Sequence, residues 1–229
     1  MNNRLKVLLA VTVLVVTLGL VTLAGTADYS PATYNPAVGE DTGFTACQTC
    51  LSYDAASYDW DFDGDGVYDI STPDPTVEHA FSEAGFVVVI LRVDEGGGRY
   101  TTCRKGILVG ETPLFAVRNV TADASGSVLV EITVSAYVGV RAVGLEETLP
   151  IGWQWEILDA ANAITKKEGQ NLQVLWMNPI EAGETWTVSY RLYPSIGTGS
   201  PLLAGTVSGY DGENARVKVS ICGDLAIKK

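Results

Sequence analysis

The sequence predicts an all-β protein, with two tandem antiparallel β-sandwiches of immunoglobulin type after an N-terminal signal peptide. Three observations lead to this fold class. Apolar and polar residues alternate in short runs, which is typical of strands that bury one face. Turns rich in glycine or marked by proline separate these runs, and no stretch keeps a helical period for three turns. The part of the chain that follows the signal fits two sandwiches of about 100 residues each.

The N-terminus has the order of features found in secretory signal peptides. Arg4 and Lys6 precede an apolar run over residues 7–23, and small residues then offer a cleavage site, which we place after Ala27. Because the apolar run is slightly short for a membrane-spanning helix, an uncleaved anchor is the alternative. In either case the chain is expected to be exported, and to lie outside the cell or at its surface. Membrane contact is expected only through an uncleaved N-terminal segment.

The first sandwich is expected over residues 28–110 and the second over residues 111–229, with the boundary near Gly110–Pro113. Alternation in the first half predicts strands at 42–46, 58–62, 76–81, 86–93 and 100–109. Alternation in the second half predicts strands at 114–120, 127–134, 153–157, 184–192 and 215–221. Residues 160–164 are expected to form one short turn of helix.

Charge and composition exclude several classes of function. The formal net charge is −12, and nucleic acid is an unsuitable partner because phosphate binding requires clustered lysine and arginine. The chain shows no nucleotide-binding loop, nucleophile elbow or zinc-protease helix. His79 is the single histidine, and it has no recognisable nucleophile motif beside it. The sequence therefore predicts a protein that is not an enzyme and requires no cofactor.

An acidic turn offers a candidate metal site. Asp61, Asp63, Asp65 and Asp69 have the spacing of a calcium loop through its ninth position. Thr72 stands where such a loop has its bidentate glutamate, and the turn lies between strands instead of helices. In the alternative interpretation the aspartates cap a turn while the flanking aromatic residues face the core. Weak calcium binding is the hypothesis that this spacing supports.

Two blocks of residues in the first half occur at a recognisable spacing. The first is Trp60-Asp61-Phe62-Asp63-Gly64-Asp65-Gly66, and the second combines His79, Phe81 and Gly85. Together they resemble the PKD domain, a β-sandwich module of secreted and cell-surface proteins, over roughly residues 34–110. The resemblance implies an accessory or adhesive module without catalytic activity. It also implies that His79 is a buried, hydrogen-bonded framework residue.

The second half carries two further patterns. These are Glu147-Thr148-Leu149-Pro150-Ile151-Gly152-Trp153, and Ala182-Gly183-Glu184-Thr185-Trp186-Thr187-Val188-Ser189-Tyr190. They resemble the sandwich repeats of bacterial and archaeal surface proteins, although the later Asn-x-Ala of those repeats is replaced by residues 205–209. The resemblance implies a structural or adhesive role at the cell surface.

Four cysteines in an exported chain favour disulfides. In an immunoglobulin-type sandwich the second strand ends at the pole where the last strand begins, so we expect a Cys50–Cys103 or Cys47–Cys103 bridge. If the sandwiches are strung end to end, Cys222 lies at the far pole, and the leftover cysteine could join Cys222 of a neighbouring chain into a polymer. A local Cys47–Cys50 bridge and a folded-back second sandwich are the alternatives. A zinc site at Cys47 and Cys50 would need four ligands. Cys103, Cys222 and His79 are too scattered in the sequence to supply the others.

Two functions follow. The first is a non-catalytic secreted or cell-surface protein that acts through contacts with other surface proteins or with itself, in adhesion or in envelope or filament assembly. The second is a carbohydrate-binding accessory protein of a polysaccharide-degrading system. The second requires an exposed aromatic row, for which Trp153 and Trp155 are the candidates because residues two apart in a strand share a face. Trp176 and Trp186 have the same ambiguity, and a core stripe is the competing interpretation.

Overall fold

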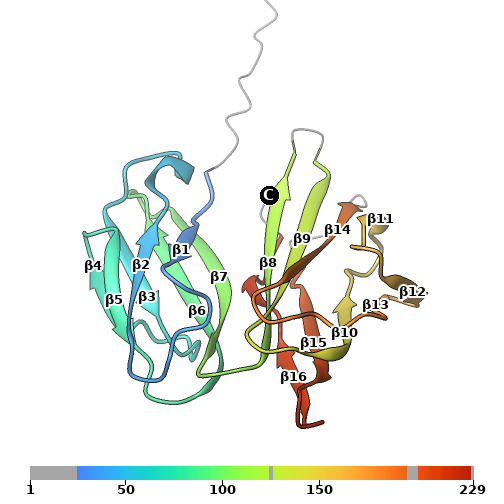
Figure 1. Cartoon of the computed structure of the whole chain (residues 1–229). Helices are drawn as coiled ribbons and strands as arrows, with labels where there is room; N and C mark the ends of the chain where they lie inside the picture. Colours follow the sequence, from blue (N-terminus) through green and yellow to red (C-terminus); the bar gives the residue numbers. More distant parts are fainter. Residues whose placement is uncertain (1–24, 124–125, 195–200, 228–229) are drawn as a thin grey trace, which may run out of the picture.

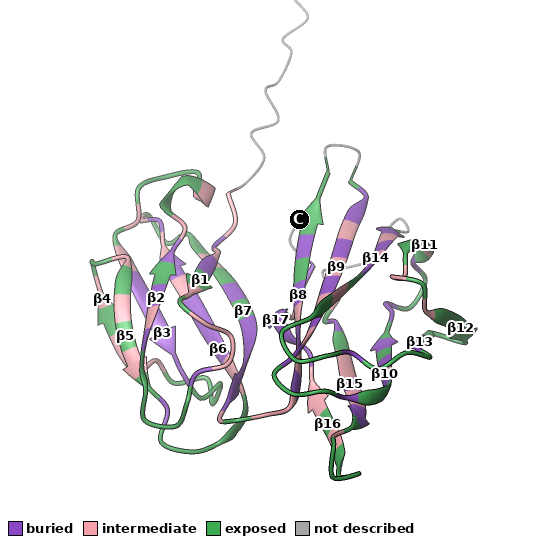
Figure 2. Cartoon of the chain, in the orientation of Figure 1, coloured by how far each residue is buried: buried purple, intermediate pink, exposed green. Residues whose placement is uncertain are grey.

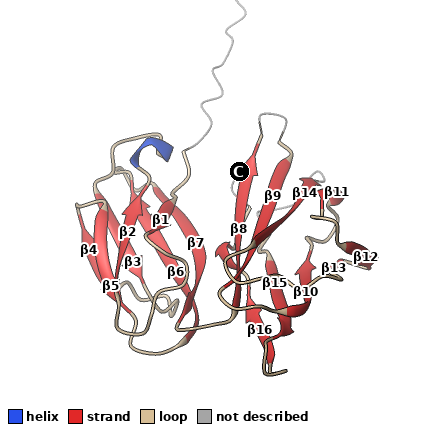
Figure 3. Cartoon of the chain, in the orientation of Figure 1, coloured by secondary structure: helices blue, strands red, loops and turns tan. Residues whose placement is uncertain are grey.

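The computed structural model describes residues 25–123, 126–194 and 201–227 (Figure 1). Strands make up 57% of the structure, and the helix drawn in blue in Figure 3 is a short 3-10 turn, so the described residues form no α-helix and the predicted all-β fold class is confirmed. Within these ranges no helix is long and apolar enough to span a bilayer. The apolar run of the expected signal peptide lies outside the described residues. Ala27, the last residue of that expected signal, is buried in the core of the first sandwich.

The first sandwich packs a three-stranded sheet against four strands of a larger sheet. The small sheet has the antiparallel order β1 (Tyr29–Pro31), β2 (Asp41–Ala46), β5 (Thr76–Ala80). The facing layer has the order β4 (Ile70–Thr72), β3 (Ser57–Asp61), β6 (Gly85–Asp94), β7 (Tyr100–Val109). A short 3-10 helix, η1 (Gln48–Cys50), follows β2. Phe44, Trp60 and Leu91 are fully buried between the two layers and form the centre of the core.

The second sandwich packs a five-stranded sheet against four more strands of the larger sheet. The five-stranded sheet has the order β12 (Ile164–Glu168), β13 (Asn171–Leu175), β10 (Arg141–Thr148), β15 (Ala204–Tyr210), β16 (Arg216–Ser220). The facing layer has the order β11 (Gln154–Asp159), β14 (Thr185–Tyr193), β9 (Val128–Ala136), β8 (Leu114–Ala122). Ile132, Leu145 and Tyr190 are fully buried in this second core.

One strand near the C-terminus joins the two sandwiches. β17 (Cys222–Asp224) lies between β7 and β8, antiparallel to the first and parallel to the second. It thereby completes a single nine-stranded sheet that runs through both sandwiches, and all three of its residues are buried (Figure 2). The expectation that Cys222 lies at the far pole of the molecule is therefore wrong. The chain folds back after β16, so β17 returns to the edge of the first sandwich.

Two other expectations differ from the structure. Residues 160–164 form no turn of helix, because Ala161 and Asn162 adopt positive φ angles of 48° and 60° in a tight turn that leads into β12. The last strand, expected over 215–221, is interrupted after Ser220, which separates β16 from β17. The two pieces lie in different sheets, and this break allows β17 to leave the five-stranded sheet.

Candidate functional site at the junction of the two sandwiches

A glycine allows β17 to approach β8 closely. Gly223 has a φ of +81°, which side-chain-bearing residues rarely adopt. A Cβ atom built on Gly223 would lie 2.1 Å from the carbonyl oxygen of Arg118 on β8. No other residue type fits this position without a shift of the backbone. The junction of the two sandwiches therefore depends on one glycine in the chain's last strand.

A buried cluster of charged groups lies where β17 meets β7. Nζ of Lys105 is 3.1 Å from Oδ1 of Asp28 and 3.2 Å from Oδ1 of Asp224, and it donates to the hydroxyl of Tyr34 at 3.4 Å. The Sγ of Cys103 lies 3.6 Å from the same Asp28 oxygen. Burial lowers the pKa of Lys105, but Asp224, Tyr34 and Asp28 outweigh burial, so its pKa lies above the ordinary value. Lys105 is thus held as an ammonium between two carboxylates.

A second buried network ties β17 to the core of the second sandwich. The Nη2 of Arg118 is 2.6 Å from Oε2 of Glu147, and neither side chain is accessible to solvent. The hydroxyl of Tyr190 donates to the other Glu147 oxygen at 3.1 Å. The Nη1 of Arg118 donates to the main-chain oxygen of Asp224 at 3.0 Å. Burial raises the pKa of Glu147, and Arg118 and Tyr190 offset part of that rise.

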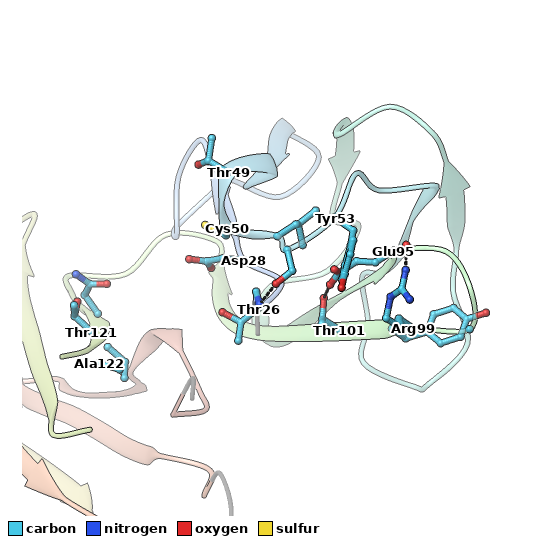
Figure 4. Close-up of a pocket in the computed structure, with 17 residues that line it drawn as sticks. Thr26, Asp28, Thr49, Cys50, Tyr53, Glu95, Arg99, Thr101, Thr121 and Ala122 are labelled. Carbon is cyan, nitrogen blue, oxygen red and sulfur yellow. Dashed lines mark hydrogen bonds between the residues drawn. The ribbon is translucent and has the colours of Figure 1, made fainter. Parts of the chain in front are cut away.

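A groove of about 1330 Å³ opens beside this junction. Its lining comes from four segments: residues 25–28 before β1, residues 49–53 after β2, the β6–β7 hairpin around Glu95 and Arg99, and the end of β8 at 119–122. Figure 4 shows the hairpin residues on one side and Thr121 with Ala122 on the other. The guanidinium of Arg99 lies 4.2 Å from the ring centroid of Tyr53, and Thr101 donates to Glu95 at 3.3 Å. Segments from both sandwiches border the groove.

The cysteines pair differently from the expectation. Cys47 and Cys50 form a disulfide across η1, with their Cα atoms 5.4 Å apart, whereas Cys103 and Cys222 are buried thiols. The Cys50–Cys103 and Cys47–Cys103 bridges are therefore wrong, because the single 3-10 turn already brings the two nearest cysteines into bonding range. Burial raises the pKa of Cys222 to about 12, so this thiol is unreactive. Neither buried thiol is placed to join neighbouring chains into the expected polymer.

Reduction of this disulfide should have a small effect on stability. A bridge between residues so close in sequence restricts the unfolded chain little, and the chain-entropy model gives about 1–2 kcal/mol. The disulfide loop also holds the N-terminal stretch, since Cys47 N–H donates to the Asp28 carbonyl and Thr26 N–H donates to the Cys50 carbonyl. We expect a small fall in the melting temperature with reductant, measured by thermal denaturation. A collapse of the whole fold would contradict this expectation.

The acidic turn holds itself together through backbone hydrogen bonds. Asp61 is fully buried, and its two carboxylate oxygens accept the N–H groups of Gly64 at 2.6 Å and Gly66 at 2.9 Å. One oxygen each of Asp61, Asp63 and Asp65 lies within 4.8 Å of the others. Asp69 lies outside this group and accepts the N–H of Phe62 at 2.7 Å. Three of the four expected metal ligands are therefore close together, and calcium binding stays a prediction.

We expect millimolar calcium to raise the melting temperature slightly, because an ion that binds only the folded state stabilises it. Replacing Asp63 with alanine should remove that increase, since Asp63 is exposed and its loss leaves the Asp61 hydrogen bonds intact. Thermal denaturation of both proteins with and without calcium measures the difference. An unchanged melting temperature in the wild type would show that the segment is only a turn.

His79 belongs to the framework of the first sandwich. The His79 ring stacks on Phe62 with centroids 4.0 Å apart, and burial lowers its pKa below the ordinary value while Asp69 and Asp63 oppose that shift. The ring is half-buried, so the expectation of a buried histidine is wrong.

Four tryptophans were candidates for an exposed aromatic row. Trp153 and Trp176 are buried, and Trp155 and Trp186 are half-buried against the same core. Lys167 further covers the ring of Trp155, with Nζ 4.9 Å from the centroid. The expected carbohydrate platform at Trp153 and Trp155 is therefore not an exposed row, because these rings pack inward.

The residues of the junction are not among those predicted from the sequence. Cys103, Lys105 and Ile107 alternate along β7 with their side chains toward the first core, and Lys105 is the charged member of that face. A lone lysine at an inward-facing position of an apolar strand is the signal that could have identified it. No local pattern indicates Asp224, because its partners are more than a hundred residues away in the sequence.

Comparison with known proteins gives no family. No family model and no curated protein matches the chain. Among solved structures of similar architecture is one from a study of carbohydrate-binding modules of the β-sandwich superfamily. Its sequence is 14% identical to this chain, its TM-score is 0.35, and the match covers 89% of this chain and 97% of that one. The major pilin SpaD of Corynebacterium diphtheriae is 8% identical with a TM-score of 0.41, covering 74% and 60%. The collagen adhesin of S. aureus is 8% identical with a TM-score of 0.34, covering 89% and 94%. Likeness at this level carries no argument about function.

Proposed function

We propose that the chain is a non-catalytic structural or adhesion protein of the cell surface or extracellular space, which acts through contacts with other surface proteins. The observation that carries this proposal is the continuous nine-stranded sheet. Two sandwiches joined by a flexible linker would move independently, whereas a shared, fully buried strand fixes their relative orientation. A fixed pair of sandwiches suits a rigid spacer or scaffold. We place the boundary between the two units at residues 110–113, between β7 and β8.

The chemistry of the described residues supports a role without catalysis. The two buried charged clusters, around Lys105 and around Arg118, form ion pairs that connect strands to one another. His79, the single histidine, stacks on the ring of Phe62. The first half is proposed to be a PKD-like module, and export is proposed to depend on the N-terminal segment.

The experiment compares two kinds of partner directly. The purified chain is mixed with cell-envelope preparations of the producing organism, before and after protease treatment, and with insoluble chitin and cellulose. Retention on intact envelopes that protease treatment abolishes supports protein–protein contact at the surface. Retention on chitin or cellulose, or on envelopes after protease treatment, would overturn the proposal in favour of carbohydrate binding. Antibody labelling of intact cells tests the location independently.

A further inference from the structure

We propose that Lys105 and Asp224 form an intramolecular amide bond, which joins β7 of the first sandwich covalently to β17. The proposal concerns a modification site and does not depend on the identity of the partner in the proposed function. Its basis is the buried cluster at the junction, where one amine lies in contact with two carboxylates. The proposed function requires no chemical reaction at this cluster.

The geometry brings the reacting atoms together before any reaction. Nζ of Lys105 is 3.2 Å from Oδ1 of Asp224, and these side chains are 7% and 2% exposed. The ammonium also lies 5.5 Å from the ring centroid of Tyr29, which covers it on the side of the core. Holding two reactants in contact replaces an encounter in solution by an intramolecular step, which is worth several orders of magnitude in rate. Exclusion of water also protects the amide product from hydrolysis.

Asp224 is the carboxyl group best prepared to be attacked. Its Oδ2 accepts the backbone N–H of Val120 at 2.9 Å, and its main-chain oxygen accepts Nη1 of Arg118 at 3.0 Å. The first contact places a fixed donor on the oxygen that becomes negative when nitrogen adds to the carboxyl carbon. The second contact fixes the backbone that carries the side chain. Asp224 therefore has the position of the electrophile.

Asp28 has the position of the proton carrier. Its Oδ1 lies 3.1 Å from Nζ of Lys105, and its side chain is 29% exposed, so it contacts both the amine and solvent. The Lys105 ammonium first transfers one proton to Oδ1 of Asp224, which makes that carboxyl group neutral, and the neutral Nζ then attacks Cγ of Asp224 while Asp28 takes the second proton. A C–N bond forms and a C–O bond breaks. Two of the three ammonium protons, one of them carried by Asp28, leave with the departing oxygen as water, and the third stays on the amide nitrogen.

Two other interpretations of the cluster are weaker. Asp28, Cys103 and Asp224 place one ligand atom each within 4.8 Å of one another, as a metal site would. The Lys105 ammonium already contacts both carboxylates, so the cluster contains its own cation and a metal ion would have to displace it. A permanent ion pair without reaction is the other interpretation, and the experiment below separates it from the amide.

The test is the mass of the wild-type chain, which requires no variant. The intact protein is denatured and weighed both freshly purified and after prolonged incubation under native conditions. We expect a mass lower than that of the unmodified chain by one water, increasing in occupancy with incubation. Trypsin should then fail to cleave after Lys105, and tandem mass spectrometry should find a branched peptide that joins residues 105 and 224. A full mass after incubation, with normal cleavage after Lys105, would overturn the proposal.

Variants assign the roles within the cluster. Lys105→Arg retains the positive charge and should keep the full mass, and Asp224→Ala should do the same. Asp28→Asn should slow the loss of water without moving the cross-link. A branched peptide that joins Lys105 to Asp28 would overturn the assignment of Asp224. Lys166 and Glu168 form an equally close pair at 3.1 Å with both side chains 65% exposed, and this internal control should remain uncrosslinked.

Discussion

Replacing Glu147 with leucine should destabilise the folded chain by roughly 3–5 kcal/mol. The carboxylate of Glu147 is the partner of the Arg118 guanidinium, and both side chains are completely buried in the second sandwich. Its removal leaves a positive charge inside the core without compensation, and it also removes the acceptor for the Tyr190 hydroxyl. Urea or thermal denaturation of wild type and variant measures the difference in the free energy of unfolding.

The neighbouring residue supplies the matched control. Glu146 precedes Glu147 on β10, but it is exposed and lies 3.7 Å from Lys218 across the sheet surface. Exposed pairs contribute about 0–1 kcal/mol, so Glu146→Leu should change stability little. The double variant Arg118→Met/Glu147→Leu should regain much of the loss, because apolar side chains can replace a buried ion pair. Equal effects of the Glu146 and Glu147 substitutions would contradict the assigned role of the buried pair.

Gly223→Ala should weaken the junction by about 2–6 kcal/mol. A positive φ at a residue with a side chain costs about 1–3 kcal/mol, and crowding against packed backbone costs about 1–3 kcal/mol more. Both apply, since the new Cβ would lie 2.1 Å from the Arg118 carbonyl oxygen at a φ of +81°. Displacement of β17 should increase hydrogen exchange in β7 and β8 more than in the outer strands. Exchange measured by mass spectrometry reports this difference region by region.

Gly212→Ala is the matched control for this substitution. Gly212 lies in the turn between β15 and β16, where an added Cβ would have no heavy atom within 4 Å and the backbone has no positive φ. Its effect should stay within about 0.5 kcal/mol. If both glycine variants behave alike, β17 does not hold the two sandwiches together.

Local periodicity predicted much of the fold because most strands carry it. β9 and β14 alternate along their length, β6 contains an unbroken apolar run, and the sequence located these strands and β7. The alternation of β12 is absent, since all five of its residues are exposed, and this edge strand was missed. β17 was missed for another reason. It is three residues long, and its partners lie more than a hundred residues earlier in the chain, beyond the range of any local pattern.

The candidate site could be predicted only in part for the same physical reason. Asp61, Asp63 and Asp65 were found because their proximity follows from sequence spacing. The cluster of Lys105, Asp28 and Asp224 combines groups from three distant segments, so their meeting is decided by tertiary structure. The predicted disulfide to Cys103 is wrong because a single turn already places Cys47 and Cys50 within bonding distance of each other.

The position of β17 has a consequence for how the chain reaches its native state during synthesis. Until the ribosome has released this late segment, β7 and β8 each have an unpaired edge over residues that β17 later covers. Such edges are prone to pair with other chains, and closing contacts of high sequence separation is slow. The first sandwich can therefore complete its interior early, while the seam between the sandwiches closes last. Chains interrupted before Cys222 would keep both edges open and should be the species most prone to aggregate.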